Sequence, residues 1–170
     1  NNMVQTTGHG LRLVDAYNCT VSNNTVQHIP VKGDTTSYYG VQCIAETTDC
    51  NIIGNTIYDS ISNGIQISNS EGASSVKSIE GNTIYNAKKY GICVEGNSSA
   101  NTIKNNTIQN ASNVGININA SSVQNILSNN INTTGNYGIF ANGATVSSIE
   151  NNVISDFISS KVNLQMRGTS

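Results

Sequence analysis

The sequence predicts an all-β protein in which short parallel strands stack as a solenoid. Two observations carry this prediction: a Gly followed by alternating apolar residues recurs six times, and each repeat places an Asn two positions before an apolar residue. Alternation with a period of two indicates strands, and no segment sustains the 3.6-residue period of a helix. A repeat of 23 to 30 residues with such short strands cannot bury its apolar face alone, so successive copies must stack.

The first strand of each repeat begins at the Gly. Its copies are Gly10-Leu11-x-Leu13, Gly40-Val41-x-Cys43, Gly64-Ile65-x-Ile67, Gly91-Ile92-x-Val94, Gly115-Ile116-x-Ile118 and Gly138-Ile139-x-Ala141. A seventh copy, Val162-x-Leu164, follows Lys161 in place of the Gly. Because the apolar residues alternate, we expect them to face the interior and the residues between them to face outward.

The second and third strands of each repeat carry apolar residues five positions apart. These pairs are Val21 and Val26, Ile52 and Ile57, Ile79 and Ile84, Ile103 and Ile108, Ile126 and Ile131, and Ile149 and Ile154. Two positions before the second member lies an Asn, at Asn24, Asn55, Asn82, Asn106, Asn129 and Asn152, with Asn2 as a further copy before Val4. We expect each Asn side chain to bond the turn backbone and its copy in the next coil.

This repeat resembles that of the pectate-lyase-like superfamily of right-handed parallel β-helices, whose members often carry an asparagine ladder between their second and third sheets. The resemblance covers essentially the whole chain. It implies a right-handed parallel β-helix of about seven coils with three short parallel sheets, the first built from the Gly-Ile-x-Ile strands. The six-residue repeat of a left-handed β-helix does not fit this spacing. We expect one β-helix domain over residues 1–170, a segment of a longer chain because Asn1 opens within a repeat.

Composition argues against two classes of partner. Charged residues make up 11% of the chain and the formal net charge is -2, which does not fit the basic surface of a nucleic-acid binder. The hydrophobic fraction is 36%, but no apolar run approaches the roughly 18 residues of a membrane span. We therefore expect neither nucleic acid nor a membrane as partner.

Cysteine and histidine residues suggest local features and no metal site. Cys19 and Cys50 occupy equivalent positions in adjacent coils, within disulfide range, although reduced stacked thiols are an equal alternative. Cys43 falls at an interior position, whereas Cys93 is expected to face outward as a reactive thiol. The two histidines, His9 and His28, have no Cys or Asp at ligand spacing and are interpreted as surface or loop residues. No acidic cluster resembles a calcium site, so neither metal nor cofactor is expected.

Two insertions interrupt the repeat and mark the candidate binding region. Residues 27–39 form a loop seven residues longer than its equivalents, and residues 69–75 extend the turn after the first-sheet strand of the third coil. Both insertions should flank the first sheet. In enzymes similar to this family, carbohydrate lies across the outer face of that sheet, so coils one to four are the expected cleft.

The expected contacts with substrate come from outward residues of this face and from the flanking turns. They are Arg12, Gln42 and Gln66 as hydrogen-bonding groups, Tyr39 and Tyr90 as rings, and Asp34 and Glu71 as acids in the inserted loops. The alternative is that the amides only solvate a β-surface and the tyrosines pack on their copies.

Cleavage of a glycosidic bond needs two carboxylates roughly 5 to 10 Å apart. Glu95 is the acid at an outward strand position of the first sheet, and Glu46 should lie about 10 Å away along the stack, two coils before it. These two residues are the predicted catalytic pair.

Two functions therefore remain open. The first is a secreted or surface carbohydrate-active β-helix that binds a polysaccharide along its first sheet and cleaves it by hydrolysis or β-elimination. The alternative is a structural or adhesive segment without catalysis, such as a phage tailspike shaft, a surface fibre or an adhesin. Either implies an extracellular location or a cell or virion surface, and a homo-oligomer stays open.

Overall fold

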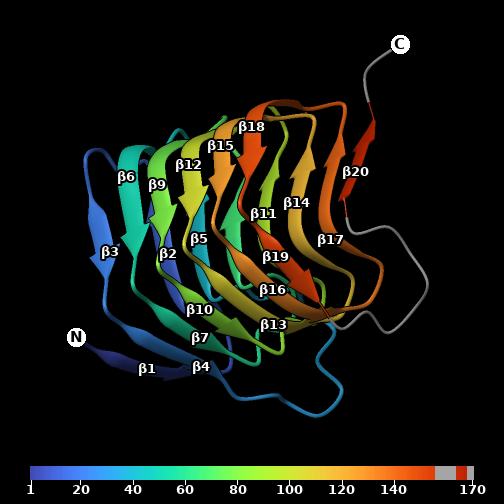
Figure 1. The fold of residues 1–170 in the computed structure, drawn as a ribbon. Helices are drawn as coiled ribbons and strands as arrows, with labels where there is room; N and C mark the ends of the chain where they lie inside the picture. Colours follow the sequence, from blue (N-terminus) through green and yellow to red (C-terminus); the bar gives the residue numbers. More distant parts are fainter. Residues whose placement is uncertain (156–163, 168–170) are drawn as a thin grey trace.

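The chain forms three parallel β-sheets that it visits in turn (Figure 1). The computed structural model describes residues 1–155 and 164–167, and this part contains no helix and hence none that could cross a membrane. Six complete coils stack between β1 and β20, which lie at opposite ends of the stack, in agreement with the predicted count of about seven. The predicted all-β solenoid is confirmed.

The first sheet joins the strands that follow the repeat Gly. They are β2 (Leu11–Val14), β5 (Val41–Ile44), β8 (Ile65–Ile67), β11 (Tyr90–Glu95), β14 (Val114–Asn119), β17 (Tyr137–Asn142) and β20 (Leu164–Arg167). Parallel pairing places Ile92 beside Ile65 on one side and Ile116 on the other, so like residues form columns.

The second and third sheets contain the paired apolar positions of the repeat. The second sheet consists of β3 (Thr20–Ser22), β6 (Thr48–Ile53), β9 (Ser75–Glu80), β12 (Ser99–Lys104), β15 (Ser122–Leu127) and β18 (Thr145–Glu150). The third consists of β1 (Met3–Thr6), β4 (Thr25–His28), β7 (Thr56–Tyr58), β10 (Thr83–Tyr85), β13 (Thr107–Ala111), β16 (Asn130–Thr134) and β19 (Val153–Ser155). In the second sheet Ile79 pairs with Ile103, and in the third Ile84 pairs with Ile108, as predicted.

The core is a stack of isoleucines. Consecutive strands of the three sheets, β9, β10 and β11, each contribute one fully buried isoleucine: Ile79, Ile84 and Ile92. Their equivalents in the next coil, Ile103, Ile108 and Ile116, are also fully buried. Each fully buried Ile contributes about 1.5–3 kcal/mol. Because the contacts run between coils, stacking stabilises every coil through its neighbours.

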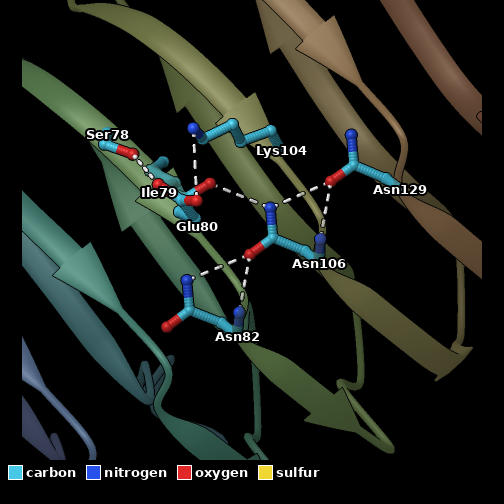
Figure 2. A network of polar contacts seen from close by, with 7 residues as sticks. All are labelled: Ser78, Ile79, Glu80, Asn82, Lys104, Asn106 and Asn129. Atoms are coloured by element: carbon cyan, nitrogen blue, oxygen red, sulfur yellow. Dashed lines mark hydrogen bonds and ion pairs between the residues drawn. The ribbon is translucent and has the colours of Figure 1, made fainter. Parts of the chain in front are cut away.

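The predicted asparagine ladder runs from Asn2 to Asn152 at the turn into the third sheet. Figure 2 shows its centre: Asn82 Nδ2 donates to Asn106 Oδ1 at 3.0 Å, and Asn106 Nδ2 donates to Asn129 Oδ1 at 2.9 Å. The same Oδ1 of Asn106 accepts the backbone N–H of Asn82, and its Nδ2 also donates to the carbonyl of Ile79. These amides are buried, and the ladder provides their partners.

The repeat Gly marks a corner where two coils approach closely. A Cβ built on Gly91 would lie 2.5 Å from Cγ2 of Ile108 and 2.7 Å from the carbonyl oxygen of Gly115, and Gly64 has the equivalent neighbours. Lack of space therefore explains why the repeat starts with Gly.

The end of the first sheet differs from the predicted register. Leu164 of β20 pairs with Ile139, the position that the repeat assigned to Val162. Val162 and Lys161 lie outside the described residues. A shift of two residues leaves the inward and outward alternation unchanged, so the sequence pattern could not distinguish the two registers.

Cys19 and Cys50 stack in adjacent coils, and both are free thiols. The backbone N–H of Cys19 donates to Sγ of Cys50 at 3.3 Å. The predicted proximity is confirmed, and of the two alternatives the structure has the reduced one. Cys43 is buried in the core, as predicted.

Candidate functional site

The two insertions flank the first sheet, as predicted from the spacing. The longer one leaves the end of β4 at His28 and returns at the start of β5, so it lies between the third and first sheets (Figure 1). The shorter one joins Ile67 of β8 to Ser75 of β9, between the first and second sheets. The first sheet therefore has an extended connection on each side.

A column of polar side chains runs along the outward positions of the first sheet. Parallel register places Gln42 beside Gln66, Gln66 beside Cys93, and Cys93 beside Asn117. Only 6%, 1%, 0% and 4% of these residues is exposed, whereas Arg12 at the end of the column is exposed. The column therefore forms the base of the face, and Gln66 cannot meet a ligand directly, contrary to the expectation for it.

Glu95 stands above this base with its carboxylate held from below. Gln66 Nε2 donates to Glu95 Oε1 at 2.9 Å, and the side-chain Oε1 of Gln66 accepts a hydrogen bond from Asn63 Nδ2. Asn63 Oδ1 in turn accepts the backbone N–H of Tyr90 at 3.2 Å. Glu95 is partly exposed, so the network presents an oriented carboxylate to solvent.

Two tyrosines lie beside this carboxylate. Burial raises the pKa of Tyr39 and of Tyr90, and the charge of Glu95, with that of Cys93 once its thiol ionises, raises both further. Their phenols therefore stay protonated at neutral pH and act as hydrogen-bond donors rather than bases. Lys89, which the sequence did not single out, places Nζ 4.8 Å from the centre of the Tyr90 ring, in a cation–π contact.

Cys93 is not the reactive outward thiol that we expected. It occupies an outward strand position but is fully buried, and burial followed by the charge of Glu95 raises its pKa to about 12. Its Sγ lies 3.7 Å from Glu95 Oε2 and accepts a hydrogen bond from Asn117 Nδ2 at 3.4 Å. Because the thiolate is the nucleophile, a thiol with this pKa is inert at neutral pH. Strand alternation predicts the direction in which the Cys93 side chain points, whereas the neighbouring side chains determine how much of it is exposed.

The model of the family described as "Right handed beta helix region" matches residues 39–161, which is most of the chain. The chain belongs to this right-handed β-helix family. The match settles the handedness predicted from the repeat and is consistent with kinship to the pectate-lyase-like superfamily. Comparison with curated proteins and with solved structures gives no significant match.

The other acids predicted for the site lie in the connections of the β-helix. Glu46 follows β5 in a left-handed backbone conformation, and its side chain packs against Gly72 of the shorter insertion. Glu71, also left-handed, precedes that glycine. In residues 1–155 and 164–167 no hydrogen bond or ion pair joins either residue to Glu95. The structure thus joins Glu95 to Gln66 and places Tyr39 and Tyr90 within reach of its charge, whereas Glu46 packs against the shorter insertion, which contains Glu71.

An aromatic cluster that the sequence did not predict holds the long loop of the β-helix. The His9 ring stacks on Tyr39 with centroids 5.3 Å apart, and the His28 ring stacks on Tyr38 at 5.6 Å. His28 is 4% exposed, so its interpretation as a surface residue was wrong. Burial, and then the charge of Arg12, lowers the pKa of His9. The available signal was the position of His9, directly before a repeat Gly as Tyr39 is.

Asp34 lies on this loop, away from Glu95. Its Oδ1 accepts the backbone N–H of Thr36 at 2.9 Å, and the hydrogen bonds to Thr36 are the main reason that its pKa is lowered. It lines a pocket with the end of the third sheet and not with the first sheet. Among the described residues, no group of three or more His, Cys, Asp or Glu side chains could hold a metal ion.

Proposed function

We propose that this β-helix binds a polysaccharide along the outer face of its first sheet, over coils one to four. The observation that supports this proposal is the Glu95 carboxylate, partly exposed and held by Gln66 beside the protonated phenols of Tyr39 and Tyr90. A carboxylate accepts hydrogen bonds from sugar hydroxyls, phenols donate them, and tyrosine rings pack on the apolar faces of sugars.

Residues of the base have different proposed roles. Gln66 uses its amide on Asn63 and Glu95, so we assign it to positioning Glu95. The side-chain Oε1 of Gln42 is buried with no hydrogen-bond partner in the described chain. An unpaired buried acceptor costs about 1–3 kcal/mol, and rotation of the Gln42 side chain toward the outer face would let a donor from a ligand offset this cost. Arg12, exposed beside Gln42, is the cation that a uronate would meet.

Cleavage is the finer proposal, with Glu95 and Glu46 as its two carboxylates. Glu46 lies two coils from Glu95, and its side chain packs against Gly72 of the shorter insertion. This packing in a connection, and not on the outer face of the first sheet, favours the second candidate function, a binding or adhesive segment without catalysis. Because polysaccharides of this kind are met outside cells, we propose an extracellular or surface location for either function.

The first prediction concerns Glu95. Isothermal titration of the chain against a panel of uronate and neutral polysaccharides should identify a ligand. Glu95→Gln should weaken its binding about tenfold or more, because a charge-assisted hydrogen bond is lost. The matched control is Glu150→Gln, an exposed acid on β18 of the second sheet, which should leave binding unchanged.

Reducing-end and ultraviolet assays on the same mixtures test cleavage. Product that disappears in both Glu95→Gln and Glu46→Gln would establish the catalytic pair, and binding without product would establish the adhesive alternative. The binding proposal fails if no polysaccharide binds, or if Glu150→Gln weakens binding as much as Glu95→Gln.

A further inference from the structure

A second concave site lies on the other side of the long loop, next to the third sheet. It is a pocket of about 430 Å³, within the usual size of a small-ligand site. Gln27 and His28 of β4 form one wall, the loop from Ile29 to Asp34 forms another, and Asp59, Ile61 and Lys88 close it from the two following coils. No residue of a first-sheet strand lines it, so the pocket is separate from the Glu95 face.

Apolar side chains form part of the lining of this pocket. They are Ile29, Pro30, Val31 and Ile61. Ile29 is 45% exposed and Val31 46% exposed, although exposed large apolar side chains are few in the described chain. Exposed apolar residues gathered in a concavity with polar groups around them are typical of a binding site.

The polar groups of the pocket are held in place but are not paired with one another. Asp59 Oδ1 accepts Nδ2 of Asn86 at 2.8 Å, and Asp34 is held by Thr36. No ion pair joins Lys88 to either carboxylate in the described part of the chain. The two carboxylates and one ammonium of the pocket sum to a charge of about −1 at pH 7.

His28 lies in the wall with little of its surface exposed. Its Nε2 lies 3.1 Å from the carbonyl oxygen of Thr7 and donates to it, and its Nδ1 is buried. The acceptors that the pocket offers above apolar side chains are therefore the carboxylates of Asp34 and Asp59.

We propose that this pocket binds one saccharide unit that is neutral or carries an amine, and that it disfavours a uronate. A sugar ring has an apolar face for Ile29 and Ile61 and hydroxyl donors for the carboxylates, whereas the carboxylate of a uronate meets two like charges against the single ammonium of Lys88. The ligand class is shared with the proposed function, but the site stands on different residues. A chain bound at the Glu95 face would leave it free for a second glycan segment.

Three sugars that differ in one substituent test the pocket: glucose, glucosamine, which is largely protonated at pH 7, and glucuronate. Each is titrated into the ¹⁵N-labelled full chain while amide chemical shifts are followed. Glucose and glucosamine should shift the amides of residues 28, 29, 31–34 and 59–61 and of Lys88. Glucuronate should bind at least about fivefold more weakly, because of like-charge repulsion.

Asp59→Asn should remove most of the difference between glucose and glucuronate. Asn tolerates the left-handed backbone of Asp59, φ 60°, so the fold should be retained. The control is Asp49→Asn, which removes an acid paired with Lys77 on the second sheet and should preserve the difference.

The proposal for the pocket is wrong if none of the three sugars shifts its amides, or if glucuronate binds most tightly. Shifts confined to Glu95 and Tyr90 would refute saccharide binding at the pocket while supporting the first-sheet proposal. Shifts at the pocket that persist in Glu95→Gln, with no polysaccharide bound at the first sheet, would leave the pocket standing and refute the other site.

Discussion

Each interior amide of the asparagine ladder joins three coils. Asn106 accepts two hydrogen bonds at Oδ1 from Asn82, and its Nδ2 donates to Asn129 and to the carbonyl of Ile79. A carboxylate of the same size could accept but not donate, and a Gln would reach one bond too far. Asn is therefore the side chain that satisfies both directions of this buried turn.

Replacing one rung should destabilise the whole stack. Asn106→Ala removes both hydrogen bonds that Asn82 donates to Oδ1 of Asn106 and the bond from Nδ2 of Asn106 to the carbonyl of Ile79. Oδ1 of Asn129 keeps only the backbone N–H of residue 106, so we expect a loss of about 3 kcal/mol or more in the free energy of unfolding. Urea denaturation measures it. Asn101→Ala removes an exposed amide on β12 and should change stability by about 0.5 kcal/mol or less. Equal losses would contradict the role of the ladder.

At the scale of the element, the repeat Gly before a first-sheet strand lies where two coils approach each other closely. The corner of β11 brings Gly91 against Ile108 of the third sheet and against the backbone of the next coil at Gly115. A side chain at this position must displace backbone, which the paired strands on both sides resist.

Gly91→Ala should therefore lower the free energy of unfolding by about 1–3 kcal/mol through overpacking. Gly8→Ala is the matched substitution, because a Cβ there would have its nearest neighbours at 3.9 Å. Thermal and urea unfolding of the two variants should separate them clearly. A Gly91→Ala protein as stable as Gly8→Ala would mean that the corner can open.

For the molecule as a whole, buried cysteine thiols and tyrosine phenols limit stability at alkaline pH. Burial raises the pKa of both Cys43 and Cys93 to about 12, against an ordinary value of 9.0. A group whose pKa is raised on folding stabilises the protein fully below the unfolded value, and the contribution is lost as pH rises toward the folded value. The window is therefore pH 9 to about 12.

Within that window the free energy of unfolding should fall by about 1.4 kcal/mol per pH unit for each of these thiols. The raised pKa values of Tyr39 and Tyr90 act in the same direction above pH 10. Urea denaturation at pH 7, 9, 10 and 11 measures the slope, and Cys43→Ala should reduce it. A free energy of unfolding that stays constant from pH 9 to 11 would refute this account.

Sequence reasoning predicted the columns of the fold well and the exposure of its outer face poorly. The positions of Ile103 and Asn106 recur in every repeat. In a stack of coils, residues at the same repeat position lie directly above one another, so their spacing predicts their contacts. Strand alternation predicted Cys93 as an outward, reactive thiol and Gln66 as a contact to ligand, yet both are buried. Alternation reports the direction of a side chain, whereas exposure depends on neighbours from other coils.

By itself the sequence determined the three sheets, the asparagine ladder, the Gly corners and the two insertions, because each depends on spacing along the chain. Only the tertiary structure decided which outward groups meet. It places Gln66 under Glu95, Tyr38 on His28, and Asp59 opposite the long loop. These contacts join residues from different coils through side-chain packing, which the repeat leaves free to vary.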